Sequence, residues 1–346
     1  MKRCDTPAAK VEESVPGLGD RQWTATSAGN PDQARLLTKV AWLYHERGIR
    51  QSQIAEDLHI SQARVSRLLR RAADVGIVRV SVVTPRGVFT ELEQVLQQRF
   101  GLQEIVVADT RPEAGDAELM SALGAAAASY LEMTLIGGDT IGISSWSSTL
   151  LATVGTMRPR PSLHADAVVQ VLGDFGMVGS QSSGARLTGE LAQVTGARPV
   201  YLSAPGLIAS SSIRTALSRD PNIAEVLAQY RKLTVLLIGI GTLEPSVLLP
   251  QSGNLITAAE LDQLRAAGAV GDLCLRFFNA EGRMVASPLD QRVVGITPKE
   301  MRAVPRTIAV AGGGRKFSAI RGALRGGWMD VLVTDLQTAE RLEAED

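Results

Sequence analysis

Cysteine and histidine are scarce in this sequence. Its 346 residues include two cysteines and three histidines. Cys4 and Cys274 lie far apart, which argues against a disulfide framework and favours a reducing, cytoplasmic environment. None of these side chains occurs at the spacing of metal ligands, so we expect no metal site.

Long apolar runs and net charge are also missing. No apolar run approaches the roughly twenty residues that span a bilayer, and Met1-Lys2-Arg3 is not followed by the apolar core of a secretory signal. We therefore expect no membrane partner. The formal net charge is +0, but basic residues are concentrated between Arg47 and Arg79. This pattern favours a small nucleic-acid-binding module on a larger neutral body.

Residues 51–76 contain two apolar stripes at helical spacing. The stripes consist of Ile54, Ala55 and Leu58, and then of Val65, Leu68, Leu69 and Ala72. A short break at residues 58–61 separates them, and Ser61 is placed to cap the second helix by accepting from an amide near Arg64. Two short helices joined by such a turn predict a helix-turn-helix.

The second of these helices has a polar face that carries several arginines and no acid. Such a helix suits the major groove of DNA, although arginine-rich faces are often only solvated and the same motif occurs inside enzymes. We expect Gln62, Arg64 and Arg67 to reach base edges, and Ser61, Arg70 and Arg71 to hold phosphates. The full set of expected DNA-binding residues is Gln53, Ser61, Gln62, Ala63, Arg64, Ser66, Arg67, Arg70 and Arg71.

The remaining organisation can be read along the chain. Residues 1–32 predict a disordered tail, and residues 33–86 an all-α helix-turn-helix domain whose first helix begins near Pro31. Within that domain, residues 77–82 alternate like a strand, which is compatible with a small wing. Residues 87–102 predict an amphipathic connector helix, a candidate dimerisation contact. Residues 103–346 predict an α/β effector domain.

Short β-branched runs alternate with helical segments beyond Gln103. Such alternation indicates a largely parallel sheet with helices on both faces, in which ligands bind outside the carboxyl ends of the strands. The expected strands are 105–107, 140–143, 167–172, 199–202, 234–238, 272–278, 307–311 and 331–334.

Three segments after expected strands are candidate ligand sites. Residues 311–316 join three glycines to Lys316 at the start of a helix, a pattern that favours anions but lacks P-loop spacing. Residues 142–149 are rich in serine hydroxyls, which could hold a phosphate or a polyol. Gly239 and Gly241 lack the third glycine of a dinucleotide fingerprint, so we expect no nucleotide cofactor. Glycine turns and seryl caps also occur for structural reasons alone.

The sequence resembles the SorC family of sugar-responsive bacterial transcriptional regulators, also called deoxyribonucleoside-regulator-like. The resemblance is carried by segment 51–80 together with IGISSWSSTL, VVQVLGDFG, YLSAPGLI, LLIGIGTLEPS, GAVGDLCLRFFNAEG and RTIAVAGGGRKFSAIRGALRGGWMDVLVTD. The resemblance covers nearly all of residues 36–344. It implies a helix-turn-helix before an effector domain similar in fold to ribose-phosphate isomerase and glucosamine-phosphate deaminase. It also implies a homo-oligomer, a dimer or tetramer, that responds to a phosphorylated sugar or polyol.

By position, the resemblance assigns Lys316 to an effector phosphate and Asp272, taken as an acid at a strand entrance, to sugar hydroxyls. Where many relatives have a glycine and an arginine after the tryptophan, this chain has Ser147 and Ser148, which implies a different ligand contact. The expected effector-binding residues are Gly142, Ser144, Ser145, Trp146, Ser147, Ser148, Thr149, Gln170, Gly173, Asp174, Gly239, Gly241, Asp272, Gly314 and Lys316.

These observations favour a DNA-binding transcriptional regulator whose operator binding is controlled by a sugar phosphate or polyol. The alternative is a sugar-phosphate isomerase or deaminase with an accessory helical domain. Such an enzyme needs a positioned general base. Asp174 and Asp335 could be nominated, and His164 lies at a strand entrance, but no acid/base pair is evident. We therefore expect no catalysis.

Overall fold

The computed structural model describes residues 31–79, 85, 87–159, 163–174, 183–244 and 256–345. The chain divides into two compact units, Met1–Val83 and Thr84–Asp346. The predicted tail lies outside the described residues, apart from Pro31 and Asp32. None of the described helices is long and apolar enough to cross a membrane.

In the described part of the first unit, residues 31–79, there are three helices: α1 (Pro31–His45), α2 (Gln51–Asp57) and α3 (Gln62–Asp74). The two apolar stripes meet α1 in a small core, where Val40, Ile54 and Val65 are fully buried. Ser61 caps α3 as predicted, since its hydroxyl accepts from the Arg64 amide at 3.2 Å. Residues 77–79 form no strand, and the rest of the expected wing lies outside the described residues.

The second unit is built on a seven-stranded sheet in the order β1-β9-β8-β5-β2-β3-β4. Every pairing in this sheet is parallel, as the alternation of strands and helices predicted. The strands are β1 (Glu104–Ala108), β2 (Thr140–Ile143), β3 (Ala167–Gln170), β4 (Arg198–Val200), β5 (Val235–Gly239), β8 (Arg306–Val310) and β9 (Val331–Asp335). All strand ends that carry the predicted ligand segments therefore meet at one edge.

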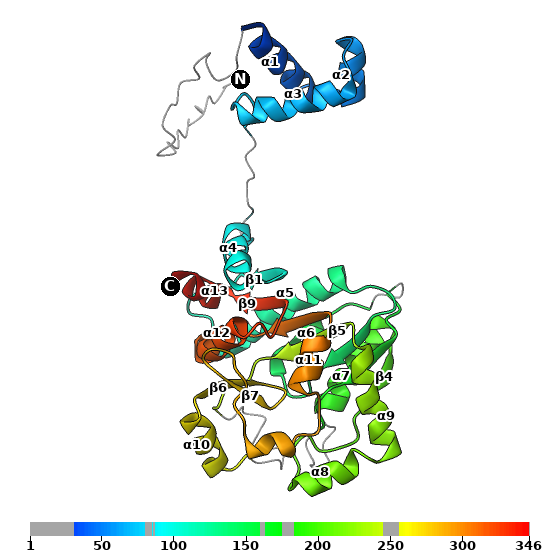
Figure 1. Ribbon diagram of the computed structural model, residues 1–346, viewed down its shortest axis with the longest axis vertical. Coiled ribbons are helices and arrows are strands. Elements are labelled where there is room, and N and C mark those ends of the chain that lie inside the picture. Colours follow the sequence, from blue (N-terminus) through cyan, green and yellow to red (C-terminus); the bar gives the residue numbers. More distant parts are fainter. Residues whose placement is uncertain are drawn as a thin grey trace, which may run out of the picture. The chain divides into compact units, whose positions relative to one another are not determined.

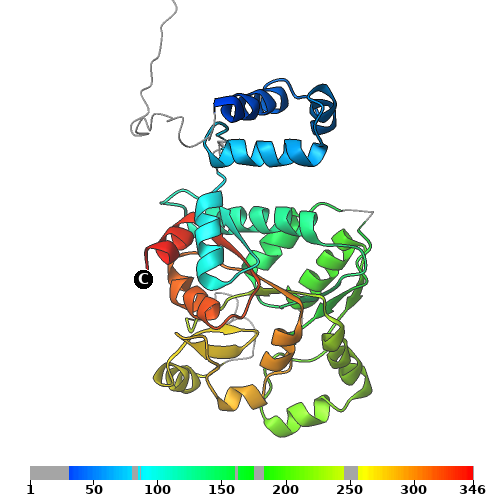
Figure 2. The ribbon, with the colours of Figure 1, turned by 45° about the horizontal axis from the view of Figure 1, so that its top comes forward.

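Helices cover both faces of this sheet (Figures 1 and 2). The two faces have separate apolar cores, and the strands supply side chains to each. One face packs against α5 (Asp116–Thr134), α6 (Ser148–Thr156) and α7 (Ser183–Thr195); the other packs against α4 (Thr90–Phe100), α12 (Phe317–Arg325) and α13 (Leu336–Ala344). The remaining helices are α8 (Ser211–Leu217), α9 (Pro221–Gln229), α10 (Ala258–Ala266) and α11 (Pro298–Ala303).

The prediction of a single strand at 272–278 is wrong. These residues belong to an antiparallel hairpin of β6 (Ala269–Leu273) and β7 (Arg276–Asn279), separate from the main sheet. The turn between them places Cys274 and Leu275 at φ 51° and 61°. Side chains of this kind rarely occupy the left-handed region, so the sequence carried no turn signal there. Asp272 consequently lies inside β6 and not at a strand entrance.

The amphipathic helix expected between residues 87 and 102 is present as α4, which is the first helix of the second unit. Leu96 on this helix is completely buried, and α4 packs against α13 and β1. Val95 remains 41% exposed. The apolar face of α4 is therefore used mainly within its own unit, and a dimerisation role for its exposed side stays a prediction.

Candidate functional site

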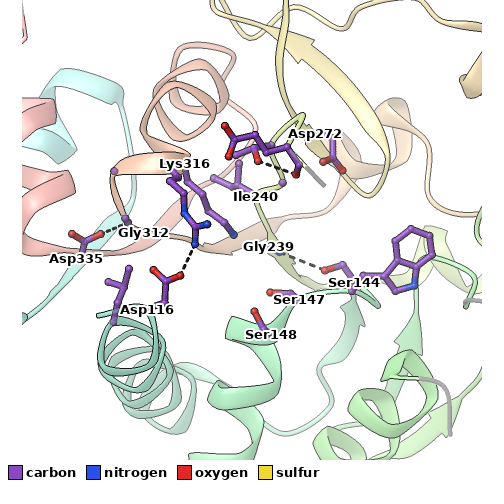
Figure 3. Close-up of a pocket in the computed structure, with 18 of the residues that line it drawn as sticks. Asp116, Ser144, Ser147, Ser148, Gly239, Ile240, Asp272, Gly312, Lys316 and Asp335 are labelled. Atoms are coloured by element: carbon purple, nitrogen blue, oxygen red, sulfur yellow. Dashed lines mark hydrogen bonds and ion pairs between the residues drawn. The ribbon is translucent and has the colours of Figure 1, made fainter. Parts of the chain in front are cut away.

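A cavity of about 480 Å³ lies at the carboxyl ends of the parallel strands (Figure 3). It is bordered by the segments that follow β1, β8, β5 and β2, by the last residue of β9, and by the β6–β7 hairpin. This is where parallel α/β sheets place their ligands, because loops and helix N-termini converge there. Nine of the predicted effector residues border it: Ser144, Trp146, Ser147, Ser148, Gly239, Gly241, Asp272, Gly314 and Lys316.

The glycine-rich loop after β8 is held in place by Asp335, the last residue of β9. The Asp335 carboxylate accepts from the Gly313 amide at 2.7 Å and from the Thr338 amide at 3.0 Å, so it also caps α13. Gly313 has φ 90°, a conformation that favours glycine. At Gly312, a Cβ atom would collide with the same carboxylate. Glycine is needed here so that the loop can pack against Asp335.

Lys316 ends the short 3₁₀ turn Gly314–Lys316 that leads into α12. Within the described part of the chain, its ammonium makes no hydrogen bond or ion pair with another side chain. Burial lowers the pKa of Lys316. The carboxylate of Asp272 raises this pKa, and the guanidinium of Arg315 lowers it further. A cation that is partly dehydrated and makes no hydrogen bond or ion pair among the described residues is suited to an anionic ligand group.

Asp272 faces the same cavity from the hairpin (Figure 3). Burial raises the pKa of its carboxyl from 3.8 to about 6, while the Leu275 amide and Lys316 act in the opposite direction. The Leu275 amide donates to one carboxylate oxygen at 2.9 Å. Gly241 exchanges backbone hydrogen bonds with Asp272, and any Cβ at Gly241 would collide with its carboxylate. Gly241 is therefore needed for this close approach, whereas a Cβ at Gly239 would collide with Ser147.

The serine-rich turn after β2 lies across the cavity from Lys316 and Asp272 (Figure 3). The hydroxyl of Ser147 caps α6 by accepting from the Leu150 amide at 3.2 Å. Ser144 is 6% exposed, and its hydroxyl accepts weakly from the Gly239 amide at 3.4 Å. The turn thus presents hydroxyls and the N-terminus of α6 to the cavity, which suits polar or hydroxylated ligand groups.

The sequence did not indicate the residues at the rim of the cavity. Arg315 pairs with Asp116 of α5 at 2.6 Å, although the two are far apart in the chain. Arg111, in the loop after β1, pairs with Glu118 at 2.6 Å. Both pairs are exposed, so they contribute little to stability. The partner of Arg315 is set by three-dimensional packing, which no local sequence signal records.

Six predicted effector residues do not border the cavity. Ser145 and Gln170 are buried beneath it and bond to each other and to the Leu172 carbonyl. Asp174 accepts from the Gly184 and Ala185 amides at the start of α7, both at 3.1 Å. Gly142, Thr149 and Gly173 are likewise enclosed by the core or by neighbouring backbone. These residues support the site from behind.

The residues nominated for catalysis have other roles in the structure. Asp335 and Asp174 both accept hydrogen bonds from backbone amides at helix N-termini. His164 is exposed and precedes β3, at the opposite end of the sheet from the cavity. Among the described residues, no three histidine, cysteine or acidic side chains form a group that could hold a metal.

All nine predicted DNA-binding residues are exposed on the first unit. Eight of them belong to α3 and its cap, and Gln53 is on α2, where its amide donates to Asp57 at 3.0 Å. Val65 and Ala72 bury the opposite face of α3. The helix is therefore attached to its unit by one side and presents Arg64, Arg67, Arg70 and Arg71 to solvent on the other.

The parallel sheet and the cavity at its carboxyl edge are typical of a ligand-binding α/β domain. Residues 87–342 match the family model described as "Putative sugar-binding domain". The chain is 31% identical to the deoxyribonucleoside regulator of Bacillus subtilis over 313 residues, which covers 90% of this chain and 98% of that protein. The chain belongs to the SorC family of sugar-binding transcriptional regulators.

Solved structures agree. The full-length sorbitol operon regulator SorC from Klebsiella pneumoniae superposes with a TM-score of 0.67 at 30% identity, covering 90% of this chain and 99% of that one. A DeoR family transcriptional regulator from Listeria monocytogenes matches with a TM-score of 0.64 at 26% identity, over 72% of this chain and 98% of its own length. The match to SorC extends over both units of the chain.

Proposed function

We propose that this protein is a transcriptional regulator that binds operator DNA through α3 and responds to a phosphorylated sugar or polyol bound in the cavity. In this proposal α2 and α3 act as a helix-turn-helix. The arginines of α3 hold phosphates and read base edges, and the cavity holds the effector. Relatives over nearly the full length of the chain are named as regulators of deoxyribonucleosides and of a sorbitol operon, which supports this assignment.

The observation that carries the proposal is the presence of Lys316 and Asp272 in one cavity. Lys316 and the amides of the glycine loop other than that of Gly313, which already donates to Asp335, would form an anion site at the start of a helix. Asp272 provides an acceptor for hydroxyls, and the serine turn adds more hydroxyl contacts. A ligand with an anionic group at one end and several hydroxyls at the other matches this distribution.

The proposal includes a dimer or tetramer of this chain. One recognition helix contacts too few base pairs to select an operator from a genome. Two helices on symmetric half-sites solve this by geometry, so that operator symmetry would mirror the symmetry of the protein.

The decisive experiment measures effector and DNA binding separately. Ribose 5-phosphate, glucose 6-phosphate, free sorbitol and inorganic phosphate are screened by thermal shift, and a duplex selected from a random library by the wild-type protein serves as operator. Lys316→Ala should weaken binding of the best anionic ligand by about 2–4 kcal/mol. The affinity of this variant for the selected duplex in the absence of ligand should remain unchanged.

Lys232→Ala is the matched control, because Lys232 is an exposed lysine of the same unit that does not border the cavity. Loss of DNA affinity in Lys316→Ala with normal ligand binding would contradict the proposal. Full response to an uncharged polyol in Lys316→Ala would instead assign the serine turn as the main anchor.

A sugar-phosphate isomerase or deaminase is the other function that the sequence left open, and turnover assays with pentose and hexosamine phosphates test it directly. We expect no turnover, since Asp174 and Asp335, the two acids that the sequence offered for catalysis, are engaged as helix caps.

A further inference from the structure

Helix α13 connects the effector cavity to helix α4 through hydrogen bonds at both of its ends. Its first end is the cap residue Asp335, whose carboxylate also holds the Gly313 amide in the loop that borders the cavity. The Thr338 hydroxyl accepts from the same amide at 3.2 Å. A shift of the glycine loop on anion binding would therefore directly displace the first turn of α13.

The other end of α13 is held by Arg99, which belongs to α4. One guanidinium nitrogen of Arg99 donates to the carbonyls of Leu342 at 2.7 Å, Glu343 at 2.9 Å and Glu345 at 2.5 Å. The last carbonyls of a helix lack partners within the helix and carry partial negative charge, so a cation that binds three of them is well placed. Figure 1 shows α4 beside α13.

A second set of contacts joins the same elements through α12. Phe317 directly follows Lys316, and the guanidinium of Arg341 on α13 stacks over its ring at 3.7 Å. Arg321 of α12 pairs with Glu345 at 2.6 Å, next to the carbonyls that Arg99 holds. The two sides of the anion site, the glycine loop and the start of α12, are thus both attached to α13.

Helix α4 is the first helix of the second unit and begins at Thr90, six residues after the boundary at Thr84. Any movement of α4 changes the position from which the chain leaves for the DNA-binding unit. Packed helices respond to ligands by shifts of roughly 1–2 Å as units. α13, with both of its ends bonded, can transmit such a shift.

We propose that α13 transmits occupancy of the effector cavity to α4, and that Arg99 is the residue that couples them. The inference rests on the proposed function of the cavity, and adds to it the route by which the signal leaves the site. Without Arg99 the cavity should still bind its anion, but α4 should no longer respond.

Hydrogen–deuterium exchange of the full-length protein tests this with inorganic phosphate as probe. At about nine times its Kd, phosphate should slow exchange in residues 312–316 by up to about tenfold, because opening then requires release of the ligand. Residues 90–100 of α4 should slow as well. In Arg99→Gln, the slowing in 312–316 should persist while that in 90–100 disappears, and Arg99→Lys should restore part of it.

Arg302→Gln is the matched control. Arg302 also donates to carbonyls at the end of a helix, those of Gly326 at 2.8 Å and Gly327 at 3.3 Å, but it lies on α11 and makes none of the contacts that hold α4. This variant should behave like the wild type in both segments.

Three outcomes would overturn the inference. The first is slowing of α4 in Arg99→Gln equal to that in the wild type. The second is a wild-type protein in which phosphate slows 312–316 but leaves α4 unchanged, a result that needs no variant to fold. If phosphate slows neither segment of the wild type, the proposed effector site itself fails and the inference fails with it.

Discussion

Asp272→Asn should make the ligand-free protein more stable while it weakens the response to the effector. Asp272 is a half-buried residue in β6, and burial is the main cause of the raised pKa of its carboxyl. Asparagine has the same shape and keeps an oxygen that can accept from the Leu275 amide, the contact made at 2.9 Å. The substitution therefore removes the charge and leaves the hairpin intact.

The magnitude follows from the pKa. A carboxyl whose pKa is raised on folding is destabilising where it is ionised in both states. The cost is absent below the unfolded pKa, grows as the pH rises, and is complete above the folded pKa. One pKa unit corresponds to about 1.4 kcal/mol, so a rise from 3.8 to about 6 corresponds to about 3 kcal/mol at about pH 7.5. At about pH 5 the cost should be roughly half of this.

The assay is urea unfolding of wild type and Asp272→Asn at about pH 7.5 and about pH 5, with ligand binding measured in parallel. The asparagine amide supplies no carboxylate to ligand hydroxyls, so effector affinity should fall at the higher pH. Asp220→Asn is the control, because Asp220 is an exposed cap of α9 and asparagine caps equally well. A variant that is less stable than the wild type at the higher pH, or whose gain does not depend on pH, would refute the reasoning.

Three further predictions concern other parts of the chain. Arg64→Ala should reduce the DNA-binding free energy by roughly 1–3 kcal/mol at one base position and relax sequence preference, whereas Arg70→Ala should weaken binding to all sequences alike and flatten its salt dependence. Equal losses of affinity for selected and random duplexes in Arg64→Ala would contradict this. Gly313→Ala should lower the free energy of unfolding by roughly 1–3 kcal/mol because Gly313 has φ 90°. Gly314→Ala should not, because a Cβ at Gly314 would lie in open space, and urea unfolding measures both variants. Light scattering at micromolar concentration should show a dimer or tetramer, and a monomer that still binds operator would oppose the proposed assembly.

The sequence determined those features that depend on neighbours in the chain. The apolar stripes of residues 51–76 and the cap at Ser61 follow from helical spacing and from the hydrogen-bonding capacity of a serine, and both appear in the structure. The alternation of strands and helices likewise determined a parallel sheet and the edge at which Lys316 and the serine turn would meet.

Tertiary structure decided which residues at that edge face the cavity and which support it. Gln170 ends β3 and Asp174 lies four residues further on, at the same edge of the sheet as the cavity. The Gln170 side chain nevertheless bonds Ser145, and the Asp174 side chain caps α7. Asp272 reaches the site only through a hairpin whose turn has no glycine or asparagine.

The pairs made by Arg315 and Arg99 join residues separated by 199 and 243 or more positions. Local sequence carries no record of such partners, because a guanidinium bonds whichever carboxylate or carbonyl the packing of helices brings to it. For the same reason, the coupling of the effector loop to α4 could be recognised only once both ends of α13 had been located in space.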